Sequence, residues 1–175
     1  INLKCLSVHI GSQILDYKPY EKMLKIINKI IDKVNYKFEF IDLGGGMGIS
    51  YQDNGLKLNY KKYNLAIVNF LKNHNSKIIF EPGRSIVGNT GSLISRIVYI
   101  KKSEKKNFII LDAAMNDLIR PALYGATHKI LPSFKINKKS KKIYEFVGPI
   151  CESTDKFLTI KNFQQLKEGD YITIC

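Results

Sequence analysis

The most constraining stretch of this sequence is residues 77–84, Lys-Ile-Ile-Phe-Glu-Pro-Gly-Arg. Its apolar first half is typical of a buried strand. Pro82 and Gly83 stop that strand, because proline has no N–H to donate to a sheet and glycine permits a tight bend. We therefore expect the strand to end at Glu81. Ligands of parallel α/β folds lie beyond the carboxyl ends of strands, so Glu81 and Arg84 are candidate site residues. The alternative is an ordinary ion pair that closes a strand–helix turn.

Two strand–helix units precede this stretch. Apolar runs at 5–10 and 38–43 predict strands, and a helix is expected to begin at Pro19. Its apolar residues recur every three or four positions, at Met23, Leu24, Ile26, Ile27, Ile30, Ile31 and Val34. A second helix is expected at about 60–73, with Tyr63, Ile67, Phe70 and Leu71 facing inward.

The order strand–helix–strand–helix–strand, with each strand apolar throughout, is typical of parallel strands that are buried on both faces. We predict that residues 1–90 are the C-terminal part of a (β/α)8 barrel. A free-standing three-stranded sheet is the alternative.

The pattern changes after Gly91, where β-branched segments alternate with turns and polar loops. We expect strands at 93–100, 108–111, 143–147, 157–160 and 171–174, with one helical turn near 117–123. Residues 91–175 are therefore predicted to form an all-β module, with the boundary near Ser85–Gly91. The Lys-rich segment 135–142 is expected to be a solvated loop.

Composition bears on the possible partners. The net charge is +13, but only three of the 28 basic residues are Arg, and the Lys residues are spread over the whole chain. This disfavours a nucleic-acid-binding face, which more often clusters its charge and uses Arg. No apolar run approaches the roughly 18 residues of a membrane span, and the first residues do not resemble a signal peptide. The three cysteines form no Cys-x-x-Cys pair, which favours a reducing, cytoplasmic compartment without a zinc site.

The triple glycine Gly44–Gly46 directly follows an expected strand. Without side chains, its backbone N–H groups can converge on an anion. The run matches neither the dinucleotide-binding GxGxxG pattern nor a P-loop, so a single phosphate at a barrel mouth fits better. A mobile connection is the alternative. His9 alone is more typical of a packed histidine at a strand end, but it falls at the same expected sheet edge as Gly44 and Glu81, which favours a functional role more than the residue alone would.

Two later segments carry further candidates. Arg120 and Tyr124 are four residues apart, and a guanidinium can hold a carboxylate through two hydrogen bonds while the phenol supplies another. The alternative is a surface turn with an ordinary ion pair. Cys151 and Glu152 place a thiol and a carboxylate in one turn. In isolation, Cys151 would be interpreted as a small buried apolar residue.

Five motifs occur in order along the chain: His9–Gln13, Gly44–Gly46, Glu81–Arg84, Met115–Tyr124 and Cys151–Asp155. Together they resemble the diaminopimelate decarboxylases, which are fold-type III, pyridoxal-phosphate-dependent enzymes related to alanine racemase and ornithine decarboxylase. The glycine run and Glu-Pro-Gly-Arg are shared by the wider decarboxylase group. The Met115–Tyr124 run and the Cys-Glu-Ser turn are more specific to the diaminopimelate branch.

The resemblance implies a binding site for pyridoxal 5'-phosphate. His9 would lie against a face of the pyridine ring and take part in catalysis, and Glu81 would pair with the ring nitrogen. The phosphate would be held by a set of small and basic residues, namely Ser12, Gly44, Gly45, Gly46, Gly83 and Arg84.

The resemblance also implies a reaction, the decarboxylation of meso-diaminopimelate to L-lysine and CO2. Arg84, Arg120 and Tyr124 would bind the distal part of this amino acid. Cys151 would protonate the carbon that has lost CO2, and Glu152 would receive the distal ammonium. In the family the Cys-Glu turn reaches the neighbouring subunit's site, so a homodimer is the expected functional unit.

None of the 25 Lys residues matches the position that forms the Schiff base in this family. The chain thus resembles an internal fragment, or a split or decayed gene product, and we expect it to be inactive and poorly stable alone.

Two alternative functions stay open. One is a sibling decarboxylase acting on ornithine or arginine, and the other is an inactive decarboxylase-like interaction protein. Arg120, Tyr124 and Glu152 favour a substrate with a carboxylate and an ammonium at its far end. The strands after Gly91 disfavour a small pyridoxal-phosphate carrier.

Overall fold

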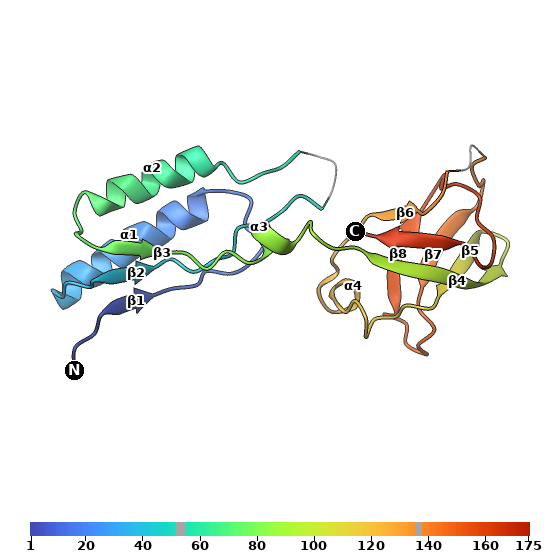
Figure 1. Cartoon of the computed structure of the whole chain (residues 1–175), viewed down its shortest axis with the longest axis horizontal. Coiled ribbons are helices and arrows are strands. Elements are labelled where there is room, and N and C mark those ends of the chain that lie inside the picture. Colours follow the sequence, from blue (N-terminus) through green and yellow to red (C-terminus); the bar gives the residue numbers. More distant parts are fainter. Residues whose placement is uncertain (52–54, 136–137) are drawn as a thin grey trace. The chain divides into compact units, whose positions relative to one another are not determined.

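The computed structural model describes residues 1–51, 55–135 and 138–175, and the chain forms two compact units, Ile1–Thr90 and Gly91–Cys175 (Figure 1). Each unit has its own hydrophobic core. The Lys-rich segment expected to be a solvated loop falls partly on residues 136 and 137, which lie outside the described residues.

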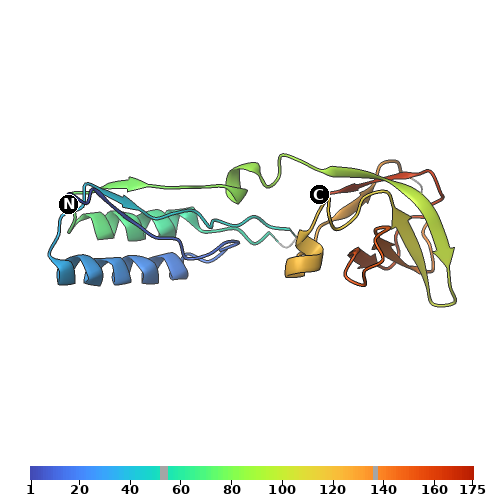
Figure 2. The same ribbon diagram turned by 90° about the horizontal axis from the view of Figure 1, so that it is seen from below.

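The first unit is a parallel sheet with helices on one side. Strands β1 (Cys5–Ser7), β2 (Phe40–Asp42) and β3 (Lys77–Ile79) pair in the order β1-β2-β3. Helices α1 (Lys18–Val34) and α2 (Tyr60–Leu71) both lie on the same side of these strands (Figure 2), and a short helix α3 (Arg84–Val87) follows β3. Proline in its first turn favours the start of α1, and Asn35 in the left-handed region ends it.

The core of the first unit lies between the sheet and the two helices. Its wholly buried side chains are Tyr20, Ile41 and Leu43. Tyr63, Ile67 and Phe70 of α2 point inward as expected, whereas Leu71 is only partly buried.

The apolar stripe of α1 is covered only in part. Met23, Leu24, Ile27 and Ile31 are buried, but Ile26, Ile30 and Val34 are exposed. The sheet and α2 cover only part of a stripe that is wider than one contact face.

The strands of the first unit are shorter than the apolar runs predicted. β1 ends at Ser7 rather than Ile10, and β3 ends at Ile79 rather than Glu81. The reason is that the backbone turns at the glycine run, where Gly44 and Gly46 have φ angles of +65° and +89°. Single hydrogen bonds continue past the strands without forming a regular ladder.

The second unit is a mixed sheet that curls around its core (Figure 1), with strand order β6-β9-β4-β5-β7-β8. The strands are β4 (Leu93–Lys102), β5 (Lys106–Leu111), β6 (Ile130–Pro132), β7 (Ile143–Val147), β8 (Lys156–Ile160) and β9 (Tyr171–Ile174). β5 and β7 pair in parallel and the other neighbours are antiparallel. A one-turn helix α4 (Arg120–Tyr124) begins later than the predicted turn.

The second unit is therefore the all-β part that the sequence predicts. The first unit has three parallel strands in its described part, so the expectation of a (β/α)8 barrel extends beyond what this sheet contains. Within the described residues, no helix has the length and apolar character needed to span a membrane.

Candidate functional site

The carboxyl ends of β1, β2 and β3 meet at one edge of the first sheet. The Val8 N–H donates to the Asp42 carbonyl over 3.0 Å, and the Leu43 N–H donates to the Ile79 carbonyl over the same distance. Beyond them, the Glu81 N–H donates to the carbonyl of Gly44 over 2.9 Å. The expectation that His9, Gly44–Gly46 and Glu81 lie at a common edge is thus confirmed.

The glycine run packs against the neighbouring strand ends so closely that a side chain would not fit. A Cβ atom on Gly45 would lie 2.2 Å from the carbonyl oxygen of Glu81. One on Gly46 would lie 2.3 Å from the carbonyl oxygen of Gly11. Within the described residues, no hydrogen-bond acceptor faces the N–H groups of Gly45 and Gly46. These two N–H groups are therefore available to an anion.

Two side chains that the sequence did not single out hold this run in place. Asp42 accepts hydrogen bonds from the Gly44 N–H at 2.8 Å and from the Ser7 hydroxyl at 3.2 Å. The buried Tyr20 hydroxyl donates to the Gly45 carbonyl at 3.2 Å. The Gly44 N–H is consequently engaged within the protein, which leaves the anion-binding capacity to the next two glycines. A carboxylate two residues before the glycine run was a signal for Asp42, whereas nothing marked Tyr20.

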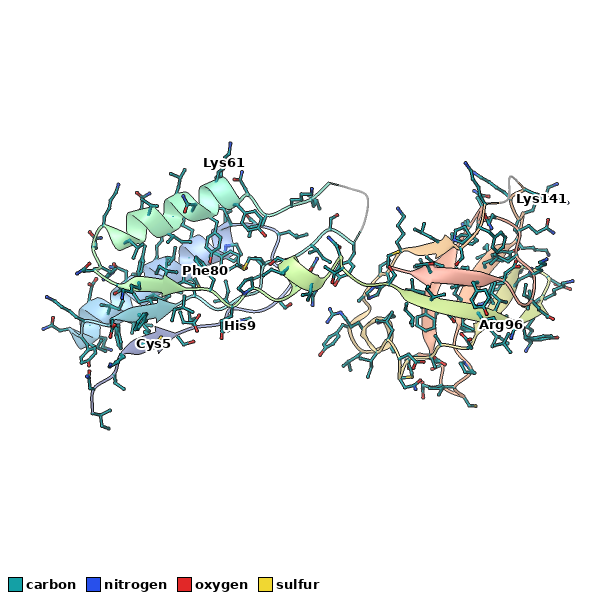
Figure 3. All side chains as sticks on the ribbon, in the orientation of Figure 1. Cys5, His9, Lys61, Phe80, Arg96 and Lys141 are labelled. Atoms are coloured by element: carbon teal, nitrogen blue, oxygen red, sulfur yellow. The ribbon has the colours of Figure 1, made fainter. Side chains whose placement is uncertain are left out.

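His9 lies just beyond β1 and close to the glycine run. Figure 3 shows it past the end of that strand, and the side chain is exposed. A Cβ atom on Gly44 would lie 3.0 Å from the Nδ1 atom of His9. Ser12 is also exposed and belongs to the same loop, beside Gly11. Both residues are accessible to a ligand at this edge.

The side chain of Arg84 is held by a glutamine. Its Nη1 donates to Oε1 of Gln13 over 3.0 Å, and its guanidinium lies 5.8 Å from the ring centre of Tyr51. Gln13 also donates to the carbonyl of Ile49 over 2.6 Å. Within the part of the chain that the structure describes, no salt bridge joins Glu81 and Arg84, so the alternative of an ordinary ion pair between them is wrong. Gln13, which has a left-handed φ of 62°, joins the His9 loop to Arg84.

In the second unit, Arg120 and Tyr124 are the first and last residues of α4. The guanidinium carbon of Arg120 lies 5.1 Å from the ring centre of Tyr124, which places it over the aromatic face. The Nε atom of Arg120 is buried and has no hydrogen-bond partner among the described residues. A buried donor without a partner is unfavourable, so this atom is suited to an acceptor such as a carboxylate.

The turn after β7 exposes the thiol of Cys151, so its interpretation as a small buried residue is wrong. Glu152 is also exposed, and its Oε1 accepts hydrogen bonds from the Thr154 N–H at 3.3 Å and the Ser153 hydroxyl at 3.1 Å. These bonds hold the pKa of Glu152 below its ordinary value, with the Thr154 N–H the largest cause. Glu152 thus offers an ionised carboxylate beside an accessible thiol.

The chain resembles known proteins over nearly its whole length. Residues 13–175 match the family model of the pyridoxal-dependent decarboxylase C-terminal sheet domain. The chain is 37% identical over 179 residues to a diaminopimelate decarboxylase of Aquifex aeolicus, covering 99% of this chain and 42% of that protein. It is 41% identical over 170 residues to one of Helicobacter pylori, covering 95% and 42%.

Solved structures are also similar. The diaminopimelate decarboxylase of M. jannaschi has a TM-score of 0.89 and 31% identity, with 99% of this chain and 41% of that chain covered. The H. pylori enzyme in complex with L-lysine has a TM-score of 0.82 and 40% identity, with 98% and 43% covered. The chain thus spans about 42% of the length of the curated relatives that it matches.

Proposed function

The chain belongs to the pyridoxal-dependent decarboxylase family, and from this premise we propose that it contributes to the decarboxylation of meso-diaminopimelate to L-lysine and CO2. The observation that carries the proposal is the common edge at which His9, the glycine run and Glu81 meet. A ligand with an anionic group and a flat polar body could use all three features. The identity to diaminopimelate decarboxylases over nearly the whole chain supports the choice of substrate.

The residues at this edge fit pyridoxal 5'-phosphate. The N–H groups of Gly45 and Gly46 are suited to the phosphate, with Ser12, Gly83 and Arg84 contributing from the neighbouring segments. Glu81 is exposed at the same edge and would hold a proton on the pyridine nitrogen, while His9 would lie against the ring. The bound cofactor supplies a sink for the electron pair left on the substrate's α carbon when CO2 departs.

Arg120 and Tyr124 would bind the distal carboxylate of the substrate, and Arg84 is a further candidate for binding the distal part of this amino acid. The unpartnered Nε of Arg120 offers one donor of the planar fork, and stacking on Tyr124 keeps the guanidinium in a fixed orientation. Glu152, with its pKa held low, would accept the distal ammonium as an ion pair. A substrate carrying both charges at its far end is diaminopimelate rather than ornithine.

Cys151 would donate the proton that replaces the departed CO2. Its exposed position allows the thiol to reach a bound ligand, and it can be reprotonated from solvent before the next turnover.

We further propose that the first unit is part of a (β/α)8 barrel. The functional unit would be a homodimer in which the Cys151 turn serves the neighbouring subunit. A cytoplasmic setting would keep the thiols reduced.

A chimera tests the proposal. The 175 residues would replace the matching segment of the Aquifex aeolicus enzyme, and CO2 release would be measured with meso-diaminopimelate, ornithine and arginine. We expect release from diaminopimelate alone. A folded chimera that binds the cofactor but releases no CO2 from any of the three would overturn the proposed activity, and preferential release from ornithine or arginine would overturn the substrate. The unaltered relative is the control.

A further inference from the structure

Asp155 is a buried carboxylate that joins two segments of the second unit distant in sequence. The residue is 3% exposed. Its Oδ1 accepts the Met115 N–H at 2.7 Å, and its Oδ2 accepts the Ile150 N–H at 2.8 Å. No basic side chain forms a salt bridge with it in the described part of the chain. Asp155 is therefore stabilised by backbone donors, and each of its two oxygens binds a different segment.

Both segments carry candidate site residues. Ile150 directly precedes Cys151, so its N–H bond fixes the start of the thiol-bearing turn. The end of that turn is fixed by backbone bonds, because the Asp155 N–H donates to the Glu152 carbonyl at 3.0 Å. Met115 begins the segment that continues into α4 and thus into Arg120. A single carboxylate therefore links the proton-donor turn to the chain that leads to the substrate-binding arginine.

The backbone is adapted to this carboxylate. A Cβ atom on Gly148 would lie 2.3 Å from Oδ2 of Asp155, so a larger residue there would displace the side chain. The Gly148 N–H also donates to the Asp155 carbonyl at 3.1 Å. The glycine after β7 thus leaves room for the carboxylate to reach both donors.

We propose that Asp155 is a positioning residue that fixes the Cys151 turn relative to the Met115 segment, an inference that rests on the proposed function for the roles of Cys151 and Arg120. Asp155 acts through these segments. Its buried carboxylate, with both oxygens engaged, has no part in binding the substrate.

Asp117 provides a matched control. Its Oδ2 accepts the Ala114 N–H at 2.8 Å, one residue before Met115, and among the described residues it forms no hydrogen bond to the Cys151 turn. Asp117→Asn therefore perturbs the same segment in the same chemical way but leaves Ile150 untouched. In Asp155→Asn, the amide nitrogen that replaces one oxygen cannot accept a hydrogen bond, so one of the two N–H groups loses its partner.

The test uses the full 175-residue chain with Cys5→Ser and Cys175→Ser, so that Cys151 is the single thiol. Amide hydrogen exchange at Met115 and Ile150 and the alkylation rate of Cys151 by iodoacetamide are measured. In Asp155→Asn we expect exchange at one or both amides to rise about tenfold and the alkylation rate to change several-fold. Asp117→Asn should leave Ile150 and Cys151 unchanged. A folded Asp155→Asn variant with unaltered exchange and alkylation would overturn the inference.

A measurement on the chain without the aspartate substitutions covers the case in which Asp155→Asn does not fold. Because each amide donates to an oxygen of the buried Asp155 carboxylate, Met115 and Ile150 should both exchange more slowly than unstructured amides of the same local sequence. Absence of protection at either amide would contradict the inference.

Neither readout needs cofactor or substrate, so each result stands even if the chimera proves inactive. In an active chimera, Asp155→Asn should lower kcat about tenfold per folded site, with the cofactor absorbance retained. A residue that only stabilised the fold would reduce the amount of folded enzyme and leave kcat per site unchanged. Asp155→Glu, which keeps both oxygens, should recover part of the lost kcat.

Discussion

The hydroxyl of Tyr20 donates a hydrogen bond to the carbonyl oxygen of Gly45 over 3.2 Å, in the interior of the first unit. The ring of Tyr63 lies 4.3 Å away, centre to centre, and its own buried hydroxyl has no partner among the described residues. Burial, with a smaller effect of Tyr60, raises the pKa of Tyr20 to about 12. The phenol therefore stays protonated at neutral pH and remains a donor that orients the glycine run.

These two tyrosines give a first prediction. Tyr20→Phe should lower the free energy of unfolding by about 1 kcal/mol, because the Gly45 carbonyl loses its donor. Tyr63→Phe should be neutral or slightly stabilising, because it removes a buried hydroxyl that has no described partner. Urea unfolding followed by circular dichroism measures both. If both variants lost the same free energy of unfolding, the hydrogen bond from Tyr20 to Gly45 would contribute no more to stability than the Tyr63 hydroxyl does.

How far the sequence predicts this structure depends on the range of the interactions involved. β7 and β9 were predicted to the residue, because alternating apolar side chains are a local pattern. β6 was missed, since three residues ending in a proline carry too little pattern. The strand ends were misplaced because left-handed glycines redirect the backbone, which composition does not reveal.

In the candidate site, too, the features that follow from local sequence were predictable and those that depend on long-range packing were not. Motif order placed His9, Gly44–Gly46 and Glu81 at one edge, because parallel strands bring their carboxyl ends together. The contacts that hold these residues were not predictable from spacing. Tyr20 reaches Gly45 across 25 positions, and Asp155 reaches Met115 across 40. Such pairs follow from packing of the whole unit rather than from any local signal.

A second prediction concerns acid stability of the second unit. Burial raises the pKa of Glu145, but hydrogen bonds from Lys106 and Lys156 outweigh it and hold the pKa below its ordinary value of 4.5. The pKa of Asp112 is lowered mainly by the Ser95 hydroxyl. A depressed folded-state pKa stabilises the fold above the unfolded value, and this contribution is lost as the pH falls through the folded pKa. Stability should therefore decline progressively below about pH 4.5.

The free energy of unfolding between pH 6 and pH 3 checks this expectation. Glu145→Gln should be less stable than the unaltered chain at about pH 6 and should show a shallower decline on acidification. Glu104→Gln, which alters an exposed carboxylate in the turn between β4 and β5, is the control and should keep the slope. An unchanged slope in Glu145→Gln would mean that its two lysine contacts contribute nothing in solution.

The third prediction concerns Cys151 in the active chimera. Loss of a positioned general acid typically slows turnover by about 10²–10⁴-fold, so Cys151→Ala should lower kcat by roughly two orders of magnitude or more. Cofactor absorbance should persist, since no cofactor contact is assigned to this thiol. Cys5→Ala changes an exposed thiol in the first unit and should leave kcat unchanged. Near-native turnover of Cys151→Ala would remove the thiol from the mechanism.

The last prediction concerns Arg120. Its Nε is buried and unpartnered among the described residues, and its guanidinium stacks on Tyr124. In Arg120→Lys the charge is kept, but the ammonium has no planar fork and cannot stack in the same way. We expect KM for diaminopimelate to rise about tenfold, equivalent to about 1.4 kcal/mol, with a smaller effect on kcat. Arg96→Lys, on β4, is the matched control and should leave KM unchanged. If Arg120→Lys lowered kcat alone, the guanidinium would act on the reacting carbon rather than on the far end of the substrate.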